Sequence, residues 1–275
     1  MKKGFKISFL ILMLVVMCTG CDAIHASSNR DIRHSGFAIS GSELECKDLY
    51  KNNDYDKVKF LTGSHVIMES GVVYSLSISQ KYSNDQHCMI SPLKEEVVAL
   101  FDENIVKLKN GKYYYLVRSG ENAAYTQVPS KDANYMIYDV ILKSNDVLKV
   151  KTVDANAGKY YVLKSDGNVY NYVLNKNFNS AKIVSTPVVY SKSNYGGDIR
   201  DFNYMGNATG TFVKTDTEYF RMMPTNREEC SKYVDVTCQF EMHLDEGLTK
   251  HRNKILGFSG TYLITTYGKQ FNATA

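Results

Sequence analysis

The most constraining feature of this sequence is a strand pattern that recurs five times. Each copy contains a short strand, a turn, a second strand, a tight turn and a third strand with Tyr or Phe. The copies occupy residues 58–78, 97–117, 148–174, 199–222 and 254–273. A unit of this size cannot bury both faces of its own sheet, so the copies are expected to stack on one another.

The turns between the second and third strands recur at similar intervals. They contain Gly71, Gly111, Gly167, Thr217 and Gly268, which are 40, 56, 50 and 51 residues apart. Intervals of this length match the four-stranded blades of β-propellers. The dipeptides Asn110-Gly111 and Asp166-Gly167 also predict two-residue type I′ hairpin turns, in which both central residues have positive φ.

Segments between the copies can supply the fourth strand of each sheet. The candidates are residues 135–142, 182–190 and 233–244. No such segment follows the last copy, so a strand at residues 32–40 is expected to pair there and cover the open edge. Because Tyr (21 residues) and β-branched residues are abundant, the sequence predicts an all-β fold, a five-bladed β-propeller-like repeat. An irregular β-sandwich or meander is the alternative.

One of the predicted hairpins resembles known repeats. The sequence YYVLKSDGNVYNY at residues 160–172 resembles the blade hairpins of bacterial β-propellers and of the regulator-of-chromosome-condensation repeats. The resemblance implies a ring of blades whose loops surround a common axis.

Residues 1–20 form a short apolar leader. Lys2, Lys3 and Lys6 lie before an apolar run at residues 7–17. This run is too short to cross a bilayer as a helix, which requires about 20 residues. The leader is therefore predicted to be a signal peptide that directs export.

The end of the leader resembles a prolipoprotein signal. The motif CTGC at residues 18–21 resembles the lipobox of bacterial prolipoproteins, although that family most often has Leu at the first position. The resemblance implies that Cys21 carries acyl chains and anchors the protein to a membrane. Cleavage after Ala26 would instead give a soluble secreted product. Residues 21–45 are predicted to be a polar tether and entry strand, and residues 46–275 a single all-β domain.

Four cysteines follow Cys21. An even number of cysteines in an exported chain predicts two disulfides. Of the three possible pairings, Cys46–Cys88 together with Cys230–Cys238 is the most local. Zinc sites usually have tighter Cys-x-x-Cys spacing with His nearby, so structural disulfides are favoured over a metal site.

Charge and the pattern of reactive residues speak against several function classes. Without the leader, 30 basic residues stand against 29 acidic ones, so the body has a net charge of +1. It therefore lacks the basic field that nucleic acid requires. The six His residues form no HxH or HExxH motif, and no GxSxG motif is present. We expect no metal, no cofactor and no nucleic-acid partner.

Acidic residues leave an enzymatic alternative open. Adjacent acids occur at Glu95-Glu96, Glu228-Glu229 and Asp245-Glu246. Neighbouring residues of a strand point to opposite faces, so these pairs are interpreted as solvated loop charges. Asp102, Asp154 and Asp201 lie near predicted inner strands and could converge on a common axis, as the two carboxylates of a glycoside hydrolase do.

The leading functional hypothesis is an exported envelope lipoprotein, not an enzyme, that binds a protein or glycan through loops on one face. The alternatives are a secreted host- or glycan-directed binding protein and a periplasmic glycan-active enzyme. Two tyrosine runs, residues 113–115 and 160–161, are either contact platforms or sheet-packing residues. Because side chains alternate in a strand, packing is expected for most of them.

Overall fold

The computed structural model describes most of the chain after the leader. The described residues are 26–31, 33, 37–43, 58–62, 65–69, 71, 73–75, 89–90, 95–116, 125–132, 134–177, 180–205, 211–225, 239–259, 262–266 and 269–273. They are mostly strands, with a few short helices. The predicted all-β fold class is therefore confirmed.

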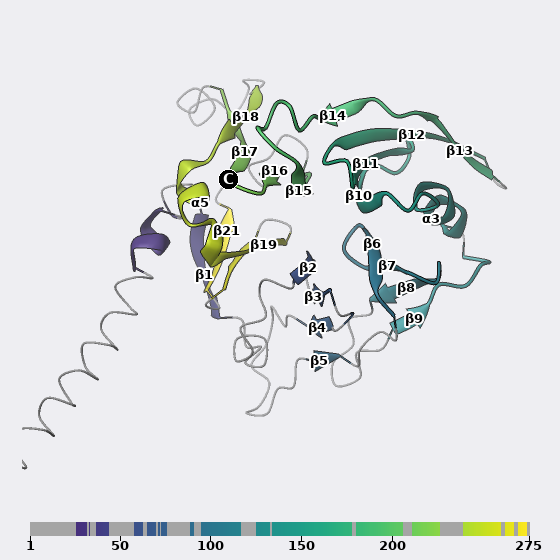
Figure 1. Ribbon diagram of the computed structural model, residues 1–275, viewed down its shortest axis with the longest axis horizontal. Coiled ribbons are helices and arrows are strands. Elements are labelled where there is room, and N and C mark those ends of the chain that lie inside the picture. Colours follow the sequence, from purple (N-terminus) through teal and green to yellow (C-terminus); the bar gives the residue numbers. More distant parts are fainter. Residues whose placement is uncertain are drawn as a thin grey trace, which may run out of the picture.

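The described strands form antiparallel meanders that follow one another along the chain (Figure 1). The first meander has the strand order β2-β3-β4-β5. All four residues of β3 are buried, so both faces of this strand are covered. The strands are β2 (Val58–Leu61), β3 (His65–Met68), β4 (Val73–Ser75) and β5 (Met89–Ile90).

The second and third meanders belong to one sheet. Their innermost strands, β6 and β10, pair in parallel, with Leu100 opposite Lys149 and Phe101 opposite Val150. The second meander contains β6 (Val97–Phe101), β7 (Ile105–Leu108), β8 (Tyr113–Leu116) and β9 (Tyr125–Gln127). The third contains β10 (Val147–Asp154), β11 (Lys159–Lys164), β12 (Val169–Asn177) and β13 (Ser180–Ser185), with β14 (Val188–Tyr190) also beside β12.

The fourth and fifth meanders complete the sequence of sheets. The fourth contains β15 (Ile199–Asn203), β16 (Phe212–Thr215), β17 (Tyr219–Pro224) and β18 (Phe240–Leu244). The fifth contains β19 (Ile255–Ser259), β20 (Tyr262–Thr265), β21 (Lys269–Ala273) and β1 (Phe37–Glu43). Each of the five predicted copies thus contains three consecutive strands of one meander.

The strand β1 comes from the other end of the chain and pairs antiparallel with β21, with Phe37 opposite Ala273 and Ile39 opposite Phe271. This confirms the prediction that an N-terminal strand covers the edge of the last copy. The strand begins at Phe37 rather than at residue 32.

Among the described residues, four hydrophobic clusters fill the spaces between successive meanders. The cluster between the first and second meanders includes Ile67, Val73, Val97, Leu100 and Val106. The next includes Phe101, Tyr113, Val150, Tyr160 and Tyr172. The other two contain Leu163, Val169, Ile199, Phe202 and Val213, and Phe212, Tyr219, Ile255, Phe258 and Phe271. Apolar burial between sheets, about 25 cal/mol for each Å² removed from water, therefore holds successive meanders together.

The fifth meander also approaches the first. A Cβ built on Gly257 of β19 would lie 2.8 Å from the Leu61 Cδ2 atom of β2. A side chain at residue 257 would therefore require the Leu61 side chain to shift. Figure 1 shows β19 next to β2 in the same way.

The prediction of a strand at residues 135–142 is wrong, because this segment forms the helix α3 (Tyr135–Ile141). Its buried residues are Ile137, Tyr138 and Ile141, whose spacing places them on one side of a helix. The Tyr138 ring meets the Phe101 ring edge to face, with centroids 4.9 Å apart. A short run of apolar residues does not distinguish a strand from a buried helix, which explains the error.

The other two predicted outer strands are found in part. Residues 182–190 contain the end of β13 and all of β14, which are interrupted at Pro187. The Pro187 carbonyl instead accepts a hydrogen bond from the Asn171 amide at 2.8 Å. Of residues 233–244, the strand β18 accounts for the last five, and residues 233–238 lie outside the described residues.

The tight turns differ in type from the prediction. Gly111 has φ +83° and Gly167 has φ +80°, but neither Asn110 nor Asp166 has positive φ. The Gly111 amide donates to the Leu108 carbonyl at 2.9 Å, and the Leu108 amide donates to the Lys112 carbonyl at 2.9 Å. This is a three-residue loop that ends in a left-handed glycine, not a two-residue type I′ turn.

The physical reason for the difference is a side-chain hydrogen bond. The Asn110 Oδ1 atom accepts from the Lys112 amide at 2.9 Å, and the Asp166 Oδ1 atom accepts from the Asn168 amide at 3.0 Å. Such Asx turns place the Asn or Asp before the glycine and leave the positive φ to the glycine alone.

The two turn glycines provide a matched pair of variants. Gly111→Ala is expected to lower the free energy of unfolding by about 1 kcal/mol, because alanine disfavours positive φ. Gly167→Ala is expected to be worse by about 1–3 kcal/mol, because its Cβ would lie 2.6–2.8 Å from the Asp198 side chain, whereas the Cβ at Gly111 meets nothing within 4 Å. Urea unfolding of both variants measures the difference, and equal losses would contradict the observed contact.

Candidate functional site

Asp102, one of the acids considered for catalysis, links the second meander to the third. Its Oδ1 atom accepts a hydrogen bond from the Thr152 amide at 2.7 Å, and its Oδ2 atom accepts one from the Thr152 hydroxyl at 2.8 Å. Its own amide donates to the Val150 carbonyl at 2.8 Å. Asp102 has φ +50°, a conformation that Asp adopts more readily than most residues.

Asp201 and Lys149 link the third meander to the fourth. The Lys149 Nζ atom lies 2.6 Å from the Asp201 Oδ1 atom, and the two side chains are 11% and 23% exposed. The same oxygen accepts a hydrogen bond from the Phe202 amide at 2.9 Å. The carboxylate is therefore held by a charge and by its own backbone.

Asp154 lies in a different setting from the other two acids. It is exposed at the end of β10, where its Oδ1 atom accepts hydrogen bonds from the Asn156 and Ala157 amides, both at 2.9 Å. Each of the three carboxylates proposed to converge thus has a local partner of its own. The contacts fit roles in inter-sheet packing and turn formation.

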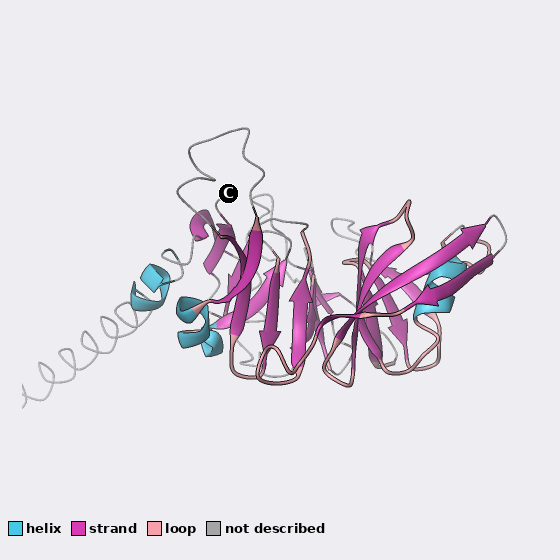
Figure 2. Cartoon of the chain, turned by 90° about the horizontal axis from the view of Figure 1, so that it is seen from above, coloured by secondary structure: helices cyan, strands magenta, loops and turns pink. Residues whose placement is uncertain are grey.

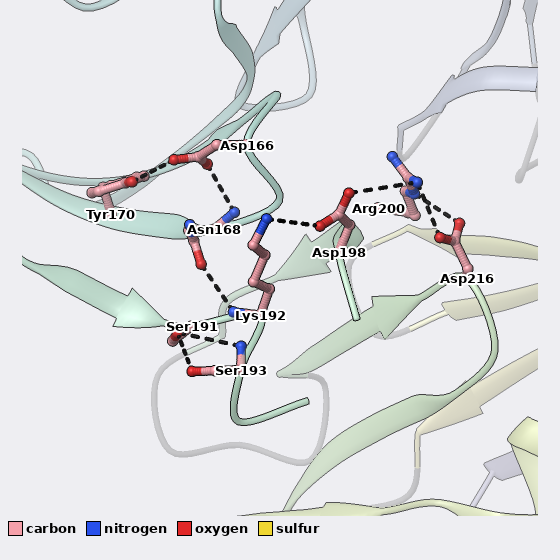
Figure 3. A network of polar contacts seen from close by, with 9 residues as sticks. All are labelled: Asp166, Asn168, Tyr170, Ser191, Lys192, Ser193, Asp198, Arg200 and Asp216. Atoms are coloured by element: carbon pink, nitrogen blue, oxygen red, sulfur yellow. Dashed lines mark hydrogen bonds and ion pairs between the residues drawn. The ribbon is translucent and has the colours of Figure 1, made fainter. Parts of the chain in front are cut away.

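A chain of polar contacts crosses the turns of the third and fourth meanders (Figure 3). The Tyr170 hydroxyl donates to Asp166 at 2.5 Å, and the Asn168 side chain accepts from the Lys192 amide at 2.9 Å. The contacts continue through residues 191–198, where Lys192 Nζ lies 3.2 Å from Asp198. We call the set of residues 109–112, 165–168, 191–198, Arg200 and Asp216 the turn face.

The ion pair at the end of this series of contacts is formed by two short hydrogen bonds. Arg200 contacts Asp216 through Nε at 2.7 Å and through a second nitrogen at 3.0 Å. The hydrogen bond from Arg200 lowers the pKa of the Asp216 carboxyl below its usual value. Both side chains are more than half exposed, so water and salt weaken the pair. The turn face therefore offers charges of both signs to a partner without depending on them for stability.

Three of the five tyrosines in the two runs pack within the fold rather than forming a platform. Tyr113 and Tyr160 are 3% and 2% exposed, and burial raises the pKa of both phenols. Tyr161 packs edge to face against Tyr190 and Tyr204, at centroid distances of 5.8 and 4.7 Å. The expectation of sheet packing is confirmed for these three side chains.

A second polar cluster joins the two ends of the described chain. Residues 26–31 are helical, and we call them, with Arg33, the amino-terminal helix. The Asp31 Oδ2 atom lies 2.9 Å from Lys250 Nζ and 2.7 Å from His251 Nε2. The hydrogen bonds from Lys250 and then His251 lower the pKa of the Asp31 carboxyl to about 2. Sequence analysis gave no signal for this cluster, since its members are more than 200 residues apart.

The helix α5 (Glu246–Lys250) presents Lys250 to this cluster. Asp245 caps it by accepting a hydrogen bond from the Leu248 amide at 2.9 Å, and its other oxygen lies 3.8 Å from Arg221 Nε. Both side chains are 2% exposed. The interpretation of Asp245 as a solvated loop charge is therefore wrong: the carboxylate is buried because it caps a helix and neutralises a buried guanidinium.

An open pocket lies beside α5. Its lining residues are Asp31, Met223, Leu244, Asp245, Glu246, Gly247 and Lys250. Leu244 is 43% exposed, so an apolar side chain lies next to charged groups at this edge.

The predicted lipidation site and the predicted disulfides are not covered by the part of the chain that the structure describes. Cys21, Cys46, Cys88, Cys230 and Cys238 lie outside the described residues. Within the part of the chain that the structure describes, no group of three or more His, Cys, Asp or Glu side chains is arranged to hold a metal ion. In the same part, no helix has the length and apolar character needed to cross a bilayer.

Comparisons with known proteins add no relative to this description. No family model matches the chain, and no curated protein matches it. Arguments about function therefore rest on the sequence and on the geometry above.

Asp201, in β15, and Asp216, in the turn after β16, allow an internal comparison of ion pairs. Asp201→Ala is expected to lower the free energy of unfolding by about 3 kcal/mol, because it leaves the Lys149 ammonium buried without its carboxylate. Asp216→Ala, which removes the exposed partner of Arg200, is expected to change it by less than about 1 kcal/mol. Chemical denaturation measures both, and equal effects would show that the Lys149 pair does not bind the sheets together.

The Asp31 cluster predicts a specific dependence of stability on pH. Since the pKa of Asp31 is lowered from 3.8 to about 2 on folding, its ionised form stabilises the fold at pH values above 3.8. That contribution disappears as the pH falls through about 2. The stability difference between wild type and Asp31→Asn should therefore shrink between pH 5 and 2. A difference that stays constant over this range would mean that the carboxylate has no favourable partner.

Proposed function

We propose that this protein is an exported lipoprotein of the cell envelope whose body binds a macromolecular partner without catalysing a reaction. The observation that carries the proposal is the CTGC motif at residues 18–21, at the end of an apolar leader that is too short to span a bilayer. Acylation of Cys21 would anchor the body at a membrane surface and leave it exposed to an extracytoplasmic space.

We further propose that the five meanders are the blades of a β-propeller. The support is the strand order, which runs through four adjacent strands in each meander, and the hydrophobic clusters between successive meanders. The pairing of β1 with β21 matches the way a propeller removes its last open edge. The contact between Gly257 and Leu61 is consistent with closure of the ring.

The turn face is the proposed binding surface. In an antiparallel meander, alternate connections leave from opposite ends, so the turns between second and third strands share one end of the sheets. Figure 2 shows the short turns of neighbouring meanders along one edge of the molecule. Loops held by a rigid scaffold are the usual place for recognition, and the exposed Lys192, Arg200 and Asp216 suit a polar protein or glycan.

The periplasmic glycan-active enzyme is the second candidate, based on Asp102, Asp154 and Asp201. It has less support, because the three carboxylates are engaged by Thr152, by the turn at residues 156–157 and by Lys149. A glycosidase requires two carboxyl groups on either side of one bond. The secreted binding protein differs from the leading proposal only in lacking the anchor.

Mass spectrometry of the mature protein tests the anchor. The mature N-terminus is expected to be Cys21 with two or three acyl chains, and an unmodified start near Ser27 would refute the lipoprotein proposal.

Affinity capture from envelope extracts tests the binding surface, by comparing wild type with Lys192→Ala/Arg200→Ala. The variant is expected to retain its stability but to lose at least about 10-fold of the captured partner, since each exposed charge contributes about 1 kcal/mol.

Lys182→Ala is the matched control for capture, since Lys182 is exposed on β13, away from the turn face. It should capture as much partner as wild type. Equal capture by all three proteins would exclude Lys192 and Arg200 from the binding surface.

A further inference from the structure

The edge of the molecule that carries the amino-terminal helix is strongly basic. We call Arg30, Arg33, Lys250, Arg252 and Lys254 the basic rim. Four of these side chains are exposed, and Lys254 is half-buried. Among the described residues, the acids of the adjoining pocket are Asp31, which contacts Lys250 and His251, the buried Asp245, which is paired with Arg221, and the exposed Glu246. Positive charge therefore exceeds negative charge here, although the body as a whole has a net charge of only +1.

The basic rim has two parts, the amino-terminal helix and residues 250–254, and the contacts of Asp31 hold them together. Besides this cluster, Lys254 Nζ lies 3.5 Å from the Ser28 hydroxyl, and Ser28 is completely buried. At 100° per residue, Ser28 and Asp31 share the side of the helix that faces the body. Arg30 and Arg33 then share the opposite side, which agrees with their exposure.

The basic rim also has an apolar component. Leu244, 43% exposed, lines the open pocket with Met223 and Lys250. Basic groups beside an exposed apolar side chain are typical of surfaces that rest on membranes, where cations meet lipid phosphates and the apolar group enters the interface.

Chain length connects this surface to the proposed anchor. Only residues 22–25 separate Cys21 from the start of the amino-terminal helix, and a chain of this length spans at most about 18 Å. Figure 1 shows the helix at the rim of the molecule beside α5, away from the sheets of the second and third meanders. An acyl chain on Cys21 would therefore keep the basic rim close to the lipid headgroups.

We propose that the basic rim is a membrane-docking surface that binds anionic phospholipid headgroups. The inference rests on the proposed function, because acylation of Cys21 is what brings this rim to the bilayer. The acyl chains on Cys21 would hold the protein at the bilayer, and the basic rim next to the anchor would add electrostatic attraction to anionic headgroups.

Vesicle binding of the unacylated protein tests the proposal. The probe is the full mature chain with Cys21→Ser, mixed with vesicles of phosphatidylcholine alone or with about one third phosphatidylglycerol. The protein is expected to co-sediment with the anionic vesicles only, and binding should weaken as salt screens the charges. Arg30→Gln/Arg33→Gln/Arg252→Gln is expected to weaken binding by on the order of 100-fold, at about 10-fold or less for each charge.

The control variant removes three charges elsewhere. Lys143 follows α3, Lys159 begins β11 and Lys182 lies in β13, and all three side chains are exposed. Figure 1 shows α3, β11 and β13 far from α5. Lys143→Gln/Lys159→Gln/Lys182→Gln has the same net charge as the rim variant and should bind like the parent chain. Equal weakening by both variants would mean that overall charge causes binding, and no preference for anionic vesicles would overturn the proposal.

The vesicle-binding experiment is independent of the test for acylation. Mass spectrometry reports the modification of Cys21, whereas co-sedimentation reports the basic rim in a chain that cannot be acylated. An acylated protein whose rim ignores anionic vesicles would refute this inference alone. A rim that binds vesicles in a protein that is never acylated would refute the lipoprotein proposal alone.

Discussion

The second, third and fourth meanders of this protein each share one hydrophobic cluster with the meander before and another with the meander after. Every residue of β3 and of β7 is buried, which is possible only when other elements lie on both sides of the sheet. The clusters around Leu100, Phe101, Phe202 and Phe258 are the result, because each is shared by two successive meanders. Folding of one meander therefore depends on its neighbours, and the arrangement of the whole chain follows from the burial of these faces.

Polar contacts fix the arrangement that hydrophobic burial favours. Asp102 and Thr152 join the second and third meanders, and Lys149 and Asp201 join the third and fourth. Burial alone is non-directional, whereas a buried ion pair or a hydrogen bond of defined length tolerates little displacement. On the surface, contacts such as Arg200–Asp216 are exposed to solvent, so they can serve recognition without a large effect on the fold.

The repeat of turns and strands allowed the position of each meander to be predicted, because alternating apolar residues and turn glycines are local signals. Predictions from local signals were wrong where a segment can adopt two conformations and tertiary or side-chain contacts select one of them. The apolar run at residues 135–142 became α3, which packs on Phe101, and the Asn110 side chain selected a longer loop than the type I′ turn. The Asp31 cluster had no local signal, since it is formed by residues from both ends of the described chain.

The sequence by itself determined the strand-rich class, the five-fold recurrence of hairpins, the near-neutral charge of the body and the apolar leader, because all of these are properties of composition and spacing. The tertiary structure alone decided which strand covers β21, which side of the chain carries the basic rim, and that Asp102, Asp154 and Asp201 have separate partners. These features depend on contacts between residues far apart in sequence, which form only when sheets pack against each other.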